Sequence, residues 1–317
     1  MCRRRSRPNP VAAASSGHEP LRYLQRLSDM NDATQTPFGT YKLAPMSERL
    51  RQLAAKLPEG RLGRAGVSLI RRLIARRGDG AYDVEVFPTI KTRLYPATNT
   101  CEKRAFVGVQ YFDPAERSFL DDAVAACRSN PFVFCDVGAN VGLYGLSVVA
   151  SGRRHGRRVS VLAVEPDPTT RRRHEVNVSF SGADACYIIE GCAAGAERGI
   201  GQIIAHENNR GEHHIAEYGG DAQGIEILPL LDIVKKHGHS RIDALKIDVE
   251  GMDYKVLEAF FATAPKSLYP TTLIVEVSKT DATPAVVTLC EKYGFAIEKR
   301  TRLNAILSRD GSKARMQ

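Results

Sequence analysis

An α/β fold with a doubly wound, largely parallel sheet is predicted by three features of this sequence. From residue 131 onward, short apolar runs alternate with helical segments, as in successive βαβ units. A glycine-rich turn directly follows the first apolar run, at 136–142. The last two runs, 294–299 and 303–308, are joined by a short connection, so they form a hairpin and one strand runs antiparallel.

The alternation assigns seven strands and five helices to the segment 131–312, which is predicted to be one ligand-binding domain. Strands are expected near 132–137, 160–165, 186–191, 243–249, 271–277, 294–299 and 303–308. Helices are expected near 141–151, 169–178, 229–237, 253–263 and 282–292.

Three segments precede this domain. Residues 1–45 are basic, with little apolar periodicity, and are expected to be disordered. Residues 46–80 predict two cationic amphipathic helices, which either lie on an anionic membrane surface or pack on the main domain; packing is preferred. Residues 81–130 predict a β-hairpin across 82–112, with its turn at 96–100, and then a helix from Pro114 to Cys127. This hairpin and helix are expected to cap the ligand edge of the sheet.

Charge and cysteine content exclude several classes of protein. The net charge of +9 arises in residues 1–80, which hold 16 Lys and Arg against 6 Asp and Glu, whereas the remaining residues hold 29 against 30. A near-neutral main domain argues against a nucleic-acid partner. No apolar run is long enough to span a membrane, and no secretion signal is recognised, so a cytoplasmic protein is expected. The 7 cysteines form no C-x-x-C pair, so no metal site is predicted.

The turn at 136–142 has the pattern D-x-G-x-N-x-G. Gly138 and Gly142 allow a sharp turn and a close approach to a ligand. Asn140 replaces the middle glycine of the dinucleotide pattern G-x-G-x-x-G, and the Asp136 carboxylate would repel a pyrophosphate. A carboxylate there suits a ligand with ammonium or sulfonium charge, such as S-adenosylmethionine. At the end of the next strand, Glu165 can accept hydrogen bonds from ribose hydroxyls.

At these residues the chain resembles the FkbM-type S-adenosylmethionine-dependent methyltransferases. The resemblance covers roughly residues 82–310 and rests on the strings DVGANVG at 136–142, VEP at 164–166, LLD at 230–232, KIDVEG at 246–251 and IVEV at 274–277. One departure is Asp253, where the family more often has Glu. The resemblance implies a seven-stranded class I methyltransferase sheet, S-adenosyl-L-methionine as cofactor, and a hydroxyl of a sugar, glycolipid or secondary metabolite as acceptor.

The predicted cofactor site lies beyond the carboxyl ends of the strands. Asp136 and Gly138 are expected to line the methionine half, and Asn140 and Gly142 of the same turn are also expected to bind the cofactor. Glu165 is expected to bind the ribose hydroxyls, Pro166 is expected to be a further cofactor-binding residue, and Ala193 is expected beside the adenine. The alternative for Glu165 is a carboxylate that only complements a helix dipole.

The catalytic prediction concerns Lys246, Asp248 and Glu250. Charges on a buried strand are costly unless they are paired, so a Lys246–Asp248 pair that only braces the strand is the structural alternative. In the functional interpretation, Asp248 or Glu250 accepts the proton of an attacking hydroxyl, with Asp248 preferred. These two carboxylates have too few companions to predict a metal. The polar stretch 206–214 is expected to be a loop that helps to select the acceptor, and His206, His213 and His214 are weaker candidates for the base.

The sequence therefore predicts a methyltransferase acting on oxygen, with a small-molecule or carbohydrate- or lipid-linked acceptor. Two alternatives remain open. One is an NAD-dependent oxidoreductase. The other is a catalytically inactive membrane-surface or interaction protein on the same fold, using the basic helices at 46–80. The oligomeric state is left open.

Overall fold

The computed structural model describes residues 35–58, 60–75, 80–205, 213–217, 224–249, 251–277 and 282–309. The chain divides into two compact units, Met1–Pro37 and Phe38–Gln317. The predicted disorder of residues 1–45 falls mostly outside the described residues.

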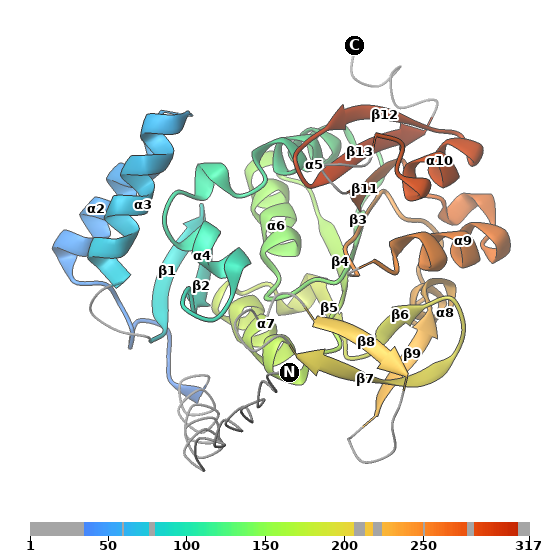
Figure 1. Cartoon of the computed structure of the whole chain (residues 1–317), viewed down its shortest axis with the longest axis horizontal. Helices are drawn as coiled ribbons and strands as arrows, with labels where there is room; N and C mark the ends of the chain where they lie inside the picture. Colours follow the sequence, from blue (N-terminus) through green and yellow to red (C-terminus); the bar gives the residue numbers. More distant parts are fainter. Residues whose placement is uncertain are drawn as a thin grey trace, which may run out of the picture. The chain divides into compact units, whose positions relative to one another are not determined.

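A seven-stranded sheet forms the centre of this unit, in the order β12-β13-β11-β10-β3-β4-β5 (Figure 1). β13 pairs antiparallel with both β11 and β12, and the other strand pairs of this seven-stranded sheet are parallel. This confirms the predicted class I methyltransferase topology with one antiparallel strand. The strands are β3 (Phe132–Val137), β4 (Val159–Val164), β5 (Tyr187–Glu190), β10 (Ala244–Ile247), β11 (Thr272–Glu276), β12 (Phe295–Arg300) and β13 (Asn304–Arg309).

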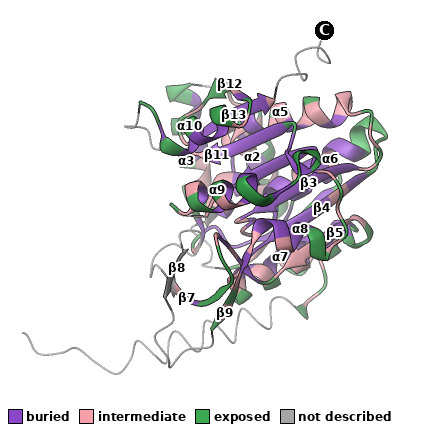
Figure 2. Cartoon of the chain, turned by 90° about the vertical axis from the view of Figure 1, so that its right-hand side faces the viewer, coloured by how far each residue is buried: buried purple, intermediate pink, exposed green. Residues whose placement is uncertain are grey.

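Both faces of the sheet are covered, because successive side chains of a strand point to opposite faces. Phe134 and Ala244 pack with α5, α6 and α7, whereas Cys135 and Leu245 pack with α8, α9 and α10. Figure 2 shows the central strands buried between these layers. The helices are α5 (Pro114–Ala126), α6 (Leu143–His155), α7 (Pro168–Phe180), α8 (Leu230–Lys236), α9 (Asp253–Thr263) and α10 (Ala285–Lys292).

The cap before the sheet differs from its prediction. Its hairpin is β1 (Tyr82–Phe87) with β2 (Ile90–Leu94), and the turn lies at Thr89, which has a φ of 68°. The region 106–111, expected as the second strand, instead holds the end of α4 (Thr100–Phe106) and a 3₁₀ turn. The reason is local: the Asn99 side chain accepts from the backbone N–H of Glu102 (3.2 Å) and so caps a helix.

A second sheet was not predicted. Its order is β6-β9-β7-β8, formed by β6 (Ala193–Gly195), β7 (Gly199–Ala205), β8 (His213–Glu217) and β9 (Ile225–Pro229). The expected loop at 206–214 is therefore wrong for His213 and His214, which lie in β8; residues 206–212 lie outside the described residues. Such short strands, two of which contain glycine, are specified by their partners rather than by their own pattern.

Two helices, α2 (Pro45–Ala55) and α3 (Arg61–Ala75), precede the cap as expected. Residues 38–44, assigned to the loose tail, are instead held by Asp83 of β1. Its carboxylate accepts from the backbone N–H groups of Gly39 (2.7 Å) and Tyr41 (3.0 Å), and it also forms a buried ion pair with Arg93 (2.7 Å). Among the described residues, no helix is long and apolar enough to cross a membrane.

Candidate functional site

Three chain segments meet at the carboxyl edge of the sheet. The glycine turn follows β3, Glu165 follows β4, and Asp248 follows β10. Parallel register places Val137 beside both Val164 and Ile247, so all three strands end at the same level. The topology therefore brings together the predicted residues from 136–142, 165 and 246–248.

The two glycines of the turn are required by sterics. Gly138 has a φ of 76°, and a Cβ there would lie 1.9 Å from the carbonyl oxygen of Asp248. Gly142 has a φ of 84°, and a Cβ there would lie 2.2 Å from the His174 ring. L-residues with side chains rarely adopt such angles. Helix α6 therefore begins at Leu143, after Gly142, and the turn lies directly against the end of β10.

Asn140 links the glycine turn to the cap. Its side-chain oxygen accepts from the Asn99 side chain (2.8 Å) and from the Val141 backbone N–H (2.8 Å). Its own backbone N–H donates to Glu165 Oε2 (2.8 Å). The predicted cofactor residue thus uses its side chain within the protein, where it fixes the turn between α4 and the end of β4.

Glu165 lies at the predicted strand end and is 8% exposed. Its two oxygens accept one backbone N–H each, from Asn140 (2.8 Å) and Asp167 (3.0 Å). Burial raises the pKa of Glu165 to about 7, although both hydrogen bonds favour the charged form. Pro166 leads into Asp167, which caps α7 through the Thr170 N–H (2.6 Å). Each Glu165 oxygen keeps a further lone pair, which can accept a ribose hydroxyl.

Asp136 is fully buried on β3, at 0% exposure, and neither carboxylate oxygen has a hydrogen-bond partner. It lies beside Lys246 in the register of β3 and β10. Burial raises the pKa of Asp136 to about 6, and the Lys246 ammonium opposes this shift. The Gly145 N–H also favours the charged form without reaching hydrogen-bonding geometry. Asp136 therefore contributes a negative field beneath the turn.

Lys246 and Asp248 form an ion pair between Nζ and Oδ2 at 3.0 Å. The Lys246 side chain is 4% exposed and that of Asp248 is 36% exposed. Burial alone would lower the pKa of Lys246, but Asp248 and Asp136 outweigh it and raise the pKa. A buried, charged lysine thus holds one oxygen of a carboxylate that is still open to solvent.

Asp253, where the sequence departs from the family pattern, begins α9 and is 5% exposed. Its Oδ1 has no hydrogen-bond partner, and burial raises the pKa of Asp253 to about 6, with a further increase from Asp248. Asp136, Asp248 and Asp253 therefore all interact with the single ammonium of Lys246. The electrostatics at this edge of the sheet favour a cation.

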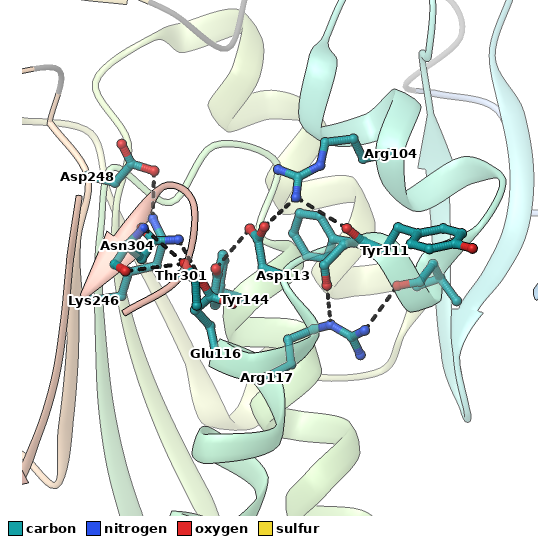
Figure 3. A network of polar contacts seen from close by, with 12 residues as sticks. Arg104, Tyr111, Asp113, Glu116, Arg117, Tyr144, Lys246, Asp248, Thr301 and Asn304 are labelled. Carbon is teal, nitrogen blue, oxygen red and sulfur yellow. Dashed lines mark hydrogen bonds and ion pairs between the residues drawn. The ribbon is translucent and has the colours of Figure 1, made fainter. Parts of the chain in front are cut away.

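A polar network that the sequence analysis missed connects this edge to the cap (Figure 3). Lys246 Nζ lies 4.9 Å from the centroid of the Tyr144 ring, and the Tyr144 hydroxyl donates to Asp113 (2.9 Å). Asp113 pairs with Arg104 of α4. The only sequence signal was a tyrosine in the first turn after the glycines. Asn99 had a clearer signal, because Asx followed by Glu three residues later is typical of a helix start.

The remaining predicted site residues lie in the second sheet or outside the described residues. Ala193 lies in β6 of the second sheet, beside Ile227. Glu250 and His206 lie outside the described residues, and His213 and His214 are described only as members of β8. Within the described ranges, no group of three or more metal-binding side chains occurs.

The arrangement fits a cationic ligand that carries a ribose and no phosphate. Three buried oxygens of Asp136 and Asp253 lack partners, and an unpaired buried carboxylate is stabilised by an arriving cation. A pyrophosphate would instead be repelled by the negative charge of Asp136, Asp248 and Glu165. The site thus suits the methionine and ribose groups of S-adenosylmethionine better than a dinucleotide.

Comparison with known proteins agrees with this chemistry. The family described as "Methyltransferase FkbM domain" matches residues 136–297, just over half of the chain. The curated relative "Methyltransferase sdnD" of Sordaria araneosa is 29% identical, and the match covers 43% of this chain and 62% of the relative. The chain therefore spans less than two thirds of that relative's length.

Two solved structures illustrate the structural matches. The "Methyltransferase FkbM from Methylobacillus flagellatus KT" has a TM-score of 0.37 and 13% identity, covering 83% of this chain and 58% of that one. The "Human methyltransferase 10 domain containing protein" has a TM-score of 0.38 and 11% identity, covering 62% of this chain and 80% of that one.

Proposed function

This chain belongs to the family of methyltransferase FkbM domains, and on that premise we propose that it methylates a hydroxyl oxygen with S-adenosyl-L-methionine as the methyl donor. The proposed acceptor is a small molecule or a carbohydrate- or lipid-linked compound. The observation that carries the proposal is the Lys246–Asp248 pair, a solvent-reachable carboxylate oriented by a buried cation at the edge of the sheet.

The carboxyl edge supplies the proposed cofactor site. Gly138 and Gly142 let the turn pack closely against Asp248 and His174, and Glu165 offers its remaining lone pairs to the ribose hydroxyls. Asp136 acts through its charge rather than by contact, because no part of it is exposed. Asp253 supplies a second carboxyl with a free oxygen. The cofactor itself would supply an electrophilic methyl group on a sulfonium.

Asp248 is proposed to orient the acceptor and to receive its proton. A new carbon–oxygen bond forms as the sulfur–methyl bond breaks, with the bonding electrons staying on sulfur, and the hydroxyl proton passes to the Asp248 carboxylate and then to water. Lys246 stays protonated throughout, because Asp248 and Asp136 raise its pKa, and it holds Asp248 in place. Proton acceptance by a positioned group typically contributes about 10²–10⁴-fold, and alignment of the reacting atoms contributes further.

The alternatives predict different ligands. An NAD-dependent oxidoreductase would bind NAD and not S-adenosylhomocysteine, and an inactive interaction protein would transfer no methyl group. Calorimetry with S-adenosylmethionine, S-adenosylhomocysteine and NAD distinguishes the proposed methyltransferase from the oxidoreductase. We expect binding of the first two ligands and none of NAD; the reverse result would overturn the proposal.

The acceptor is tested by incubation of the protein with methyl-labelled S-adenosylmethionine and a cell extract. We expect label in a hydroxyl-bearing small molecule or glycolipid, as an ether that resists mild base. Label in nucleic acid, or as a base-labile ester, would contradict the proposed acceptor class. The Asp248→Asn protein is the matched control, because it should bind cofactor but transfer little label.

A further inference from the structure

The helical pair α2 and α3 exposes an unusual amount of apolar surface. Of the seven large apolar side chains that are exposed among the described residues, five lie on these two helices. They are Met46 (65% exposed), Leu53 (58%), Leu62 (87%), Leu69 (59%) and Leu73 (51%). The other two, Ile200 and Ile297, lie on separate strands. This concentration requires an explanation, because scattered exposed leucines are ordinary but grouped ones mark a contact surface.

These side chains are not the face that holds the helices to the protein. Ala54, Val67 and Ile74 form that face and are at most 3% exposed. Arg71 also donates to the Val107 carbonyl (3.2 Å), and Gln110 donates to the Ala54 carbonyl (2.7 Å). The pair is therefore already packed on the cap through its inner face. Packing on the rest of the protein, as expected for the helices at 46–80, therefore accounts for the apolar residues of the inner face but not for the exposed ones.

The exposed residues form one stripe on each helix. Leu62, Leu69 and Leu73 are spaced by seven and four residues, so they lie on one side of α3. Met46 and Leu53 are spaced by seven residues on α2. The two helices pack side by side (Figure 1). We call these the two apolar stripes.

Cations flank both stripes. Arg49 and Lys56 are exposed next to the α2 stripe, and Arg61 and Arg72 are exposed next to the α3 stripe, each by helical spacing. Helix α3 contains four arginines and no acidic residue. The acidic residue of α2, Glu48, is already paired with Arg51 (2.7 Å). Each stripe thus combines exposed apolar side chains with neighbouring cations, and α3 contains no carboxylate that offsets its positive charge.

We propose that the two apolar stripes dock this protein on an anionic lipid bilayer. Leucines inserted at the level of the headgroups with arginines facing acidic lipids are the pattern of an interfacial helix. A second copy of the same surface would bring like charges together. Residues 1–37 also hold more basic than acidic residues, so covering the stripes with this segment would likewise bring like charges together. A nucleic acid would leave the leucines uncovered.

Docking would place the helices in the plane of the membrane rather than across it. Arginine and lysine side chains can extend their charged ends to phosphate groups while their stems lie along the apolar stripes. The inference is independent of the methyl-transfer site, because none of its residues belongs to that site. The membrane test and the methylation test can therefore fail separately.

The test is sedimentation of the full-length protein with vesicles of phosphatidylcholine alone or of phosphatidylcholine mixed with phosphatidylglycerol. We expect binding to the mixed vesicles and weak binding to the neutral ones, with a loss at high salt. The triple variant Leu62→Ser, Leu69→Ser, Leu73→Ser should weaken binding by at least about tenfold, because insertion of the stripe is lost. Arg61→Glu with Arg72→Glu should also weaken binding, and the exposed control Ile200→Ser should not.

These variants change exposed positions, so far-UV circular dichroism and thermal unfolding should match those of the wild type. Absence of binding to mixed vesicles by the wild type overturns the proposal. Equal binding by the triple serine variant also overturns it. If light scattering shows a wild-type dimer that the serine variant dissociates, with no vesicle binding, a second copy is the true occupant.

Discussion

At the scale of single residues, the site is defined by carboxyl groups in unequal environments. Asp136 is fully buried without partners, Glu165 accepts two backbone N–H groups, and Asp248 is held by Lys246 while still partly exposed. Their roles should differ accordingly. Glu165 is placed for binding, Asp248 for proton acceptance, and Asp136 for long-range charge.

Glu165→Ala should weaken binding of S-adenosylhomocysteine by about 1–3 kcal/mol, because the ribose loses a charged acceptor. Since burial raises the pKa of Glu165 to about 7, wild-type affinity should fall as the pH drops below 7, and the variant should lack this dependence. Calorimetry at several pH values measures both effects. Normal affinity in a folded variant would mean that Glu165 only braces the turn.

Asp248→Asn should leave cofactor affinity within a few-fold but reduce methyl transfer by at least about 10²-fold, the low end for loss of a general base. The change preserves the size of the side chain and removes the proton acceptor. Glu250→Gln is the comparison variant, measured by single-turnover transfer of labelled methyl. A larger loss for Glu250→Gln would make Glu250 the base and leave Asp248 as the partner of Lys246.

Asp136→Asn should stabilise the ligand-free protein at high pH. Burial raises the pKa of Asp136 to about 6, above its unfolded value of ~3.9. Folded-state stability is therefore lost as the pH rises between these two values. The variant should gain in Tm relative to wild type between about pH 4 and pH 7. An exposed-site control is Asp184→Asn, and a pH-independent difference would contradict this account.

At the scale of elements, the cap and the sheet are joined by buried polar contacts. Arg173 of α7 pairs with Glu102 of α4 at 2.9 Å, with side-chain exposures of 2% and 0%. Glu116 of α5 accepts from Thr301 (2.7 Å) and Asn304 (2.8 Å), which ties the cap to the β12–β13 hairpin (Figure 3). These contacts fix the cap beside the glycine turn. Asn140 of that turn accepts a hydrogen bond from the Asn99 side chain of the cap.

Arg173→Met should cost about 3–5 kcal/mol of unfolding free energy, because it leaves the buried Glu102 carboxylate without its cation. Replacement of both partners, Arg173→Met with Glu102→Leu, should recover much of this loss. Arg172→Met is the matched control, because the side chains of Arg172 and its partner Glu175 are 52% and 43% exposed and such pairs contribute little. Urea denaturation measures the unfolding free energy of all three variants. A double variant as unstable as Arg173→Met alone would contradict the explanation.

At the scale of the whole molecule, Phe38–Gln317 forms one compact unit. The core cluster on the α6 side of the sheet runs from Val67 of α3 through Phe106 of the cap to Phe134 of β3. The segments predicted as 46–80, 81–130 and 131–312 therefore share one core. The boundary that the structure draws lies at residue 37, not at residue 45.

Deletion of residues 1–37 should leave cofactor binding and Tm unchanged, because the compact unit begins at Phe38. Deletion of residues 1–45 should lower Tm, because Asp83 loses the backbone donors of Gly39 and Tyr41. Thermal unfolding of the two truncated proteins tests this difference. Equal Tm values would show that residues 38–44 contribute nothing to the core.

The sheet was predictable because its information is local. Apolar runs, the glycines at 138 and 142, and Asp167 before α7 each specify their own element. The hairpin of the cap was misplaced because Pro96–Thr100 also looks like a turn, while the helix cap at Asn99 needs only one side-chain hydrogen bond. The strands β6 to β9 were missed because they are short and carry only a weak apolar pattern of their own.

The sequence alone determined the fold class, the family and the edge of the sheet at which the site lies, since motif spacing and strand order follow from local patterns. Only the tertiary structure decided which side chains meet there. It placed Asp136 out of contact with solvent, linked Lys246 to Tyr144 and Asp113 of the cap, and left the stripes of α2 and α3 uncovered. Burial and partnership are properties of the packed chain, because neighbours in space are not neighbours in sequence.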